Sequence, residues 1–163
     1  MNPDIKLAYD TIIAKNAQHT EAFQYYDGVQ PLTYANDRLR EVFSGTQVKF
    51  TENWCGVVVD AARERMQVSG FTVPTSAQSA AETLWDSNQL GLLTDDVHEA
   101  ALITGEAYVI VWPDEQSGEV EIYYNDPRLC HVFYDPQRPR KARMAAKMWV
   151  DESDECYRMI LYY

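Results

Sequence analysis

The chain has 163 residues, of which 46% are apolar and 12% aromatic, so it can bury a core and is not intrinsically disordered. Its net charge of −11, from 14 basic and 25 acidic side chains, argues against a protein whose whole surface binds DNA phosphates. Two interpretations of this charge remain open: ordinary solubility, or a surface that tolerates nearby DNA without binding it.

The first predicted helix begins at Asn2–Pro3, where a side-chain N-cap precedes a proline suited to the first turn. It runs toward Tyr26 and ends at Asp27–Gly28, because glycine readily adopts the left-handed conformation of a helix end. A second, short helix is predicted over residues 34–43. The apolar face of the first helix is predicted to contain Ile5, Tyr9, Ile12 and Ile13.

The clearest amphipathic pattern predicts a helix over residues 53–67. Because burial of each valine contributes roughly 1.5–3 kcal/mol, we expect its apolar face to pack against the rest of the protein. That face contains Trp54, Val57, Val58, Ala61, Ala62 and Met66, and the opposite polar face contains Asp60, Arg63, Glu64 and Gln67.

Two further helices are predicted after a short strand at residues 71–73. Ser79 and Glu82 match a capping box that begins one of these helices. Thr94 is the predicted N-cap of the next helix, which ends at Gly105.

The pattern then changes to strands. Residues 107–112 are apolar on both faces, which predicts a central strand, and residues 120–124 alternate as a half-exposed partner. The final strand stays apolar to its last residue, so we expect a truncated hairpin and a piece of a longer protein. A third strand is predicted over residues 131–134. A loop follows Asp135–Pro136, and two further strands are predicted over residues 143–150 and 156–163.

These elements predict a single α+β domain over residues 1–163, in which N-terminal helices pack on a mostly antiparallel sheet. Residues 1–50 are expected to form N-terminal helices, residues 51–106 the core helices, and residues 107–163 the antiparallel strands. No apolar stretch approaches the roughly 20 residues that cross a bilayer, and no signal peptide is visible. We therefore expect no membrane partner and synthesis in the cytoplasm.

Asp95, His98 and Glu99 share one predicted helix face and are residue types that bind metals. Acidic residues also favour the first turn of a helix, and no second group of ligands accompanies these three, so we expect no metal site. The seven glycines form no phosphate-binding loop. We predict no catalytic residue, no cofactor and no enzymatic activity. The cysteines Cys55, Cys130 and Cys156 form no CxxC pair and are expected to be buried free thiols.

One cluster of basic residues contains Arg138, Arg140, Lys141 and Arg143. Contact with DNA phosphates, a solvated loop, and contact with the acidic surface of a neighbouring subunit are open interpretations. Against a background charge of −11 we favour the subunit contact over DNA, because exposed charges mainly orient protein partners.

Seven short motifs follow one another along most of the chain. They are Tyr25–Leu32, Asn53–Ala61, Val68–Phe71, Leu84–Leu90, His98–Val109, Asp126–Pro127 and Tyr134–Pro136. In this order and spacing they resemble the N-terminal half of the Gp6-like portal proteins of siphophages. The matching portion in that family is the outer wing, and the channel-lining helices and the clip of the family lie downstream of it.

The resemblance implies a structural subunit of a closed ring, usually dodecameric, at the portal vertex of a phage virion. Double-stranded DNA passes through such a ring during packaging and ejection without sequence-specific binding. The implied partners are further copies of the chain, capsid or scaffold protein, terminase and the head–tail connector. The resemblance also implies synthesis in the cytoplasm of the bacterial host. The alternative is a small phage adaptor or head-completion module that binds partners without catalysis.

Overall fold

The computed structural model describes residues 2–29, 53–115, 118–153 and 156–163. The helix predicted over residues 34–43 lies outside this described part. The helical elements are α1 (Pro3–Tyr26), α3 (Trp54–Arg63), a short 3-10 turn (Thr75–Ala77), α4 (Gln78–Ser87) and α5 (Leu90–Thr104). In the described ranges, no helix combines the length and the apolar character needed to span a membrane.

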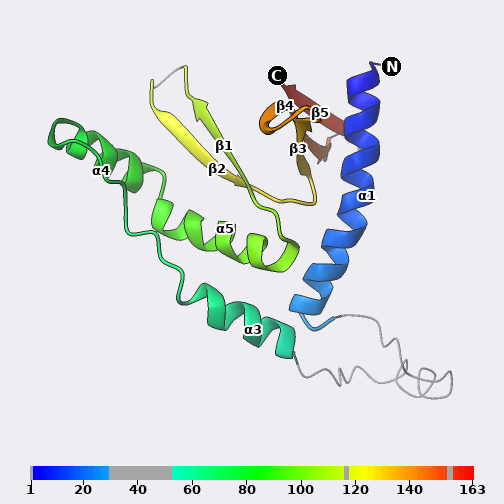
Figure 1. The fold of residues 1–163 in the computed structure, drawn as a ribbon, viewed down its shortest axis with the longest axis horizontal. Helices are drawn as coiled ribbons and strands as arrows, with labels where there is room; N and C mark the ends of the chain where they lie inside the picture. Colours follow the sequence, from blue (N-terminus) through cyan, green and yellow to red (C-terminus); the bar gives the residue numbers. More distant parts are fainter. Residues whose placement is uncertain (1, 30–52, 116–117, 154–155) are drawn as a thin grey trace.

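The strands form two small antiparallel sheets, so the predicted α+β class is confirmed (Figure 1). One sheet contains β1 (Tyr108–Pro113) and β2 (Val120–Asn125). The other has the order β3–β4–β5, formed by Cys130–Asp135, Arg138–Asp151 and Cys156–Tyr162. The prediction that β1 is a central strand is wrong, because within the described strands it pairs only with β2.

Helix α1 has the ends that its sequence predicts. The Asn2 side chain accepts a hydrogen bond from the backbone N–H of Asp4 at 2.9 Å, which satisfies one free donor of the first turn. At the other end Gly28 has a φ of +67°, a conformation that costs glycine little. The predicted stop of α5 is also confirmed, since Gly105 has a φ of +78°.

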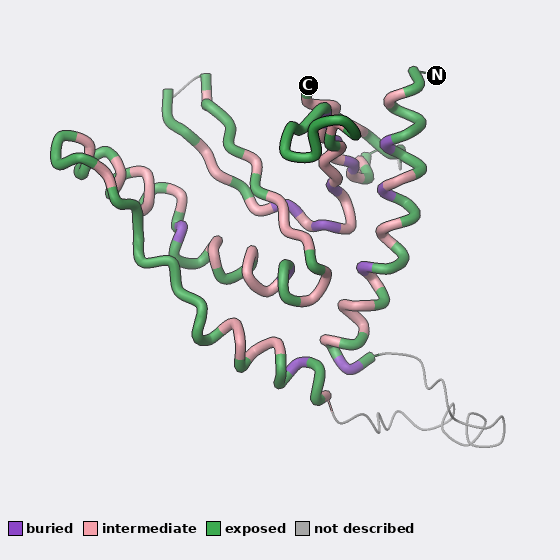
Figure 2. Tube along the Cα trace, in the orientation of Figure 1, coloured by how far each residue is buried: buried purple, intermediate pink, exposed green. Residues whose placement is uncertain are grey.

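The buried core lies between α1 and one face of the β3–β4–β5 sheet (Figure 2). Alternate residues of β4 point to this face, as the two-residue period of a strand requires. Of the four apolar residues predicted to face inward from α1, only Ile12 is buried, and the other three are about 40% exposed. The core residues are Ala8, Ile12, Met144, Ala146 and Met148.

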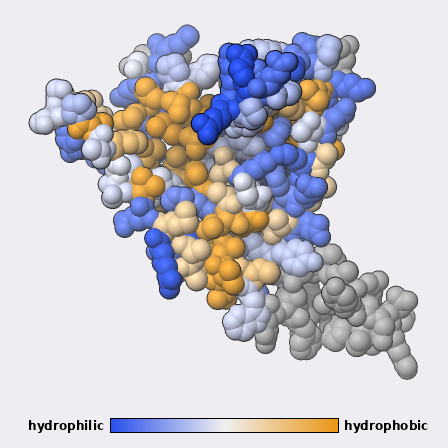
Figure 3. Space-filling model, viewed as in Figure 1, coloured by the Kyte–Doolittle hydropathy of each residue, from blue (hydrophilic) through white to orange (hydrophobic). Residues whose placement is uncertain are grey.

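Helix α3 begins where predicted but ends at Arg63, four residues before the predicted end, and the face it turns inward is not the expected apolar one. Trp54, Val57 and Val58 are 67%, 56% and 69% exposed. Asp60 and Arg63 instead point toward α1 and α5, where they form hydrogen bonds and ion pairs. The polar side of α3 therefore makes its contacts within the molecule, and apolar side chains gather on an outer face (Figure 3).

The helix starts between residues 70 and 95 differ from the prediction. Residues 71–73 form no strand. Helix α4 begins at Gln78 without a side-chain cap, so the predicted capping box does not form between Ser79 and Glu82. Helix α5 begins at Leu90, one turn before the predicted cap Thr94.

The β1–β2 sheet is held against the helices through Asn88. This side chain, between α4 and α5, donates to the carbonyl of Val120 at 2.9 Å and accepts from the N–H of Ile122 at 2.7 Å. Both backbone groups belong to β2. One amide thus acts as an additional partner for the strand, and it fixes the β1–β2 hairpin relative to α5.

Candidate functional site

The four basic residues predicted as a subunit contact lie at the start of β4, in the hairpin that β3 and β4 form. The sequence predicted a loop up to Arg143, whereas the strand begins at Arg138. Arg138, Arg140, Lys141 and Arg143 are all exposed. We refer to these four residues as the basic cluster. Figure 3 shows a strongly hydrophilic projection where Figure 1 places the start of β4.

A break in strand pairing gives the basic cluster its shape. Tyr134 on β3 pairs with Ala142, but its neighbour Asp135 pairs with Arg138, so residues 139–141 have no partner on β3. On its other edge, β4 pairs with β5 only from Ala145 onward. Extra residues in one strand bend it and redirect its side chains. The bulge at residues 139–141 therefore presents Arg140 and Lys141 outside both ladders.

Two of the four cations are held by carboxylates of the same chain. Arg138 donates to Asp135 at 3.0 Å, and Asp135 also accepts the backbone N–H of Gln137 at 2.9 Å. The hydrogen bond from Gln137 has the largest effect on the Asp135 carboxyl and the bond from Arg138 the next largest. Both lower the pKa of this carboxyl below its ordinary value. Arg143 donates to Asp4 at 2.8 Å, which ties β4 to the first turn of α1.

The other two cations, Arg140 and Lys141, make no hydrogen bond or ion pair with the part of the chain that the structure describes. Their backbone is anchored on both sides by Arg138 and Arg143, whereas their charged ends are in solvent. A pair of unneutralised cations on a fixed hairpin is suited to binding an acidic surface from another molecule.

The residues considered as metal ligands, Asp95, His98 and Glu99, do not form a metal site. The guanidinium of Arg63 lies 3.8 Å from Asp95 and donates to Glu99, so a cation of the protein already faces both carboxylates. Across the described ranges, no three potential ligands come together in a way that could hold a metal ion.

These carboxylates instead belong to a polar junction of three helices. The hydroxyl of Tyr26 on α1 donates to Asp60 of α3 at 2.9 Å and lies 3.1 Å from Glu99 of α5. Burial, together with these two carboxylates, raises the pKa of the Tyr26 hydroxyl. Sequence reasoning missed Tyr26 and Arg63 here, because nothing in the local pattern indicates partners so distant in the chain.

The cysteines differ in part from the prediction. None of the three forms a disulfide within the described residues, but only Cys130 is buried, and Cys55 and Cys156 are exposed. Burial raises the pKa of the Cys130 thiol to about 11, so it is protonated at neutral pH. An unreactive structural thiol is therefore the role that fits Cys130.

A second polar junction joins α1, β1 and β3 around Glu106. The Glu106 carboxylate accepts hydrogen bonds from Lys15 on α1 and from the hydroxyl of Tyr108 at 2.6 Å. The same hydroxyl lies 3.2 Å from Nδ1 of His131 on β3. Burial comes first among the causes that lower the pKa of His131, which favours the neutral imidazole.

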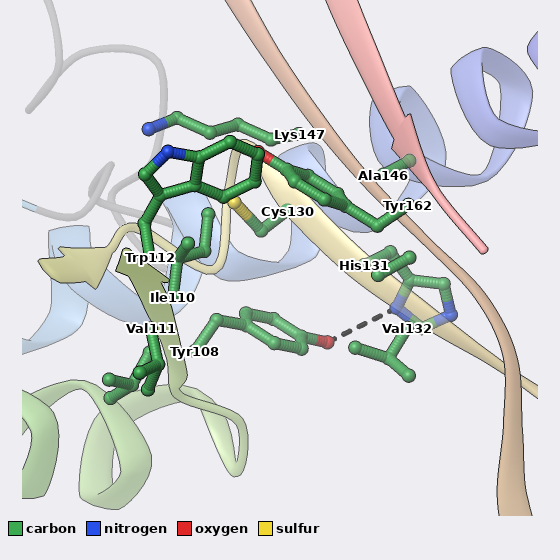
Figure 4. A pocket seen from close by; sticks show the side chains of 12 residues that line it. Tyr108, Ile110, Val111, Trp112, Cys130, His131, Val132, Ala146, Lys147 and Tyr162 are labelled. Atoms are coloured by element: carbon green, nitrogen blue, oxygen red, sulfur yellow. Dashed lines mark hydrogen bonds between the residues drawn. The ribbon is translucent and has the colours of Figure 1, made fainter. Parts of the chain in front are cut away.

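Above this junction lies a half-open pocket of about 190 Å³ between β1 and the β3–β4–β5 sheet (Figure 4). The rings of Trp112 and Tyr162 meet edge to face over it, with centroids 6.4 Å apart. Val132 and Cys130 point into the pocket, and Lys147 lies at its margin. The lining is mainly apolar, and its polar groups include the hydrogen-bonded pair of Tyr108 and His131.

The described residues thus form an α+β protein with an exposed basic cluster at the start of β4. The sequence family described as phage portal protein, SPP1 Gp6-like, matches residues 10–163. The chain therefore belongs to the SPP1 Gp6-like family of bacteriophage portal proteins. A comparison with curated proteins found no match.

The family match confirms the resemblance seen in the ordered motifs. Portal proteins are in general structural components rather than enzymes, and their place is the portal vertex of the virion. Ring formation and association with capsid and terminase are properties of the family in general.

Proposed function

We propose that this chain is a subunit of a dodecameric portal ring of a tailed phage or prophage. In this role the ring is the conduit for double-stranded DNA during packaging and ejection, and it docks terminase and the head–tail connector. The chain is made in the bacterial host, joins the capsid or scaffold protein at one vertex, and carries out no turnover of its own. The observation that carries the proposal is the family match over residues 10–163.

Two physical features support this role. The net charge of −11 makes the protein as a whole repel a DNA duplex, which suits a conduit through which DNA must slide. The basic cluster is the exception to that charge, and its two unneutralised cations fit an acidic surface on a neighbouring subunit. Arg138, Arg140, Lys141 and Arg143 are therefore proposed as residues of the contact between subunits.

Particle imaging and mass measurement of the full-length gene product test the proposal. Closed rings with a central hole, with the mass of twelve copies, are the expected result. The exposed thiols of Cys55 and Cys156 must be kept reduced, so that disulfides do not create false oligomers. A full-length product that stays monomeric up to the highest attainable concentration would contradict the proposal and favour an adaptor or head-completion module.

A further inference from the structure

Two consecutive segments of this chain differ sharply in charge. Residues 66–127 contain eleven acidic side chains and no Lys or Arg, whereas residues 128–147 contain six Lys or Arg and one acidic residue, Asp135. The acidic segment forms α4, α5 and the β1–β2 hairpin, and the basic one lies in the β3–β4–β5 sheet. Figure 1 shows these two groups of elements on different sides of the molecule.

We propose that Arg140 and Lys141 of one copy bind the acidic end of the β1–β2 hairpin of a second copy, at Glu115 and Glu119. This inference rests on the proposed function, since it names the two surfaces through which neighbouring ring subunits meet. All four side chains are exposed. The acidic end also carries Asp114 and Glu121, so its negative charge exceeds the two positive charges that it receives.

The contact joins two different surfaces of the chain. A two-fold dimer would pair them twice, reciprocally, whereas a head-to-tail arrangement uses each surface once per neighbour and closes into a ring when the rotation permits. The ring that we propose requires the head-to-tail arrangement. Figure 1 shows the free end of β1–β2 and the start of β4 at the same end of the molecule.

The shape of the basic cluster supports the same partner. Residues 139–141 lie outside the pairing of β4 with β3 and with β5, so a second copy can reach them without disturbing either ladder. Ion pairs at Arg138 and Arg143 hold the two ends of this segment in place. A backbone segment tied at both ends loses less conformational freedom on binding than a mobile loop does.

Charge reversal on each surface, and then on both, tests this contact in the full chain. One variant carries R140E and K141E, the other E115K and E119K. Each change is at an exposed position, so the thermal unfolding midpoint serves as a check that the fold is intact. A matched control with K6E and R65E changes the net charge by the same amount as the first variant, at exposed positions away from the basic cluster.

Association is measured by sedimentation velocity at low and at high salt, with reductant present. Each variant alone should need about tenfold more protein for half-association than the native chain, because attractive pairs become repulsive ones. An equimolar mixture of the two variants should recover association to within about twofold of native, since each reversed surface then meets its complement. Association of the native chain should weaken as salt rises, because the contact is exposed and screened.

The outcomes separate this contact from the proposed function. The proposed contact is wrong if the native chain forms rings and both variants form them equally well, or if the mixture does not recover association. In either case the proposed function as a ring subunit is unaffected. If R140E and K141E remove only DNA retention and leave association unchanged, the two cations bind nucleic acid instead. A native chain that never associates overturns the ring subunit itself, and this contact with it.

Discussion

Ile12 and Ile13 are adjacent on α1, yet their surroundings differ. Ile12 is 1% exposed and packs in the core with Met144 and Met148, whereas Ile13 is 41% exposed. We expect Ile12→Ala to lower the free energy of unfolding by about 2–5 kcal/mol, because it removes buried methyl groups and leaves a cavity. Ile13→Ala makes the same chemical change as a control and should cost less than about 1 kcal/mol. Urea unfolding of both variants measures the difference, and equal losses would contradict the assigned core.

At the scale of single residues, the sequence is informative where the chemistry is local. Asn2, Gly28 and Gly105 were predicted as helix ends and are so, since a cap or a left-handed turn depends only on close neighbours. The partners of Arg63 could not be predicted. Asp95 and Glu99 lie on α5, and only the folded chain brings them next to Arg63.

At the scale of elements, Glu106 joins α1, β1 and β3, and its ionisation should affect stability. Burial by itself raises the pKa of this carboxyl, but hydrogen bonds from Lys15 and Tyr108 and the nearby His131 outweigh it, so the pKa lies below the ordinary 4.5. A carboxyl whose pKa is lower in the folded state than in the unfolded state stabilises the fold at pH values above the unfolded-state pKa. That contribution is lost as the pH falls through the folded-state pKa.

We therefore expect Glu106→Gln to reduce stability at pH 7 and to flatten the loss of stability below about pH 4.5. Urea midpoints measured between neutral and acidic pH give this slope. Glu21→Gln, on the exposed surface of α1, removes a carboxyl away from the junction and serves as the control. Parallel pH profiles for native protein and the Glu106→Gln variant would show that the junction contributes nothing.

The elements themselves were largely predictable, but the surfaces they bury were not. The period of α3 shows which residues share a face, and it does not show which face the rest of the fold covers. Arg63 pairs with Asp60 and Glu99, and these contacts lie on the face of α3 that turns inward. Strand β1 is apolar on both faces, yet Val109 and Val111 are 43% and 61% exposed. An apolar run therefore did not show that both faces of the strand are covered.

The candidate site was predictable in composition and not in shape. The sequence identified Arg138, Arg140, Lys141 and Arg143 as a basic cluster, because four cations within six residues are conspicuous in an acidic chain. It could not show the bulge at residues 139–141, which depends on the register that β4 adopts against β3. Nor could it show that Asp4, far away in the chain, neutralises Arg143.

At the scale of the whole molecule, the net charge of −11 should keep the chain from retaining DNA. We expect no mobility shift of a duplex at about 0.15 M salt, because phosphate contacts release too few counterions to overcome the overall repulsion. The R140E and K141E variant provides the comparison, since it removes the two cations not engaged within the described chain. A retarded complex that the native chain forms and the variant does not would show phosphate binding at β4.

The bulge in β4 has a consequence for how such a protein can change. Because residues 139–141 pair with neither β3 nor β5, an insertion, a deletion or a reversed charge there leaves both ladders in register. The sheet and the core beneath it can therefore persist while this short segment diverges. Where it governs association, two related phages in one cell would each assemble from their own gene product and exclude the other's.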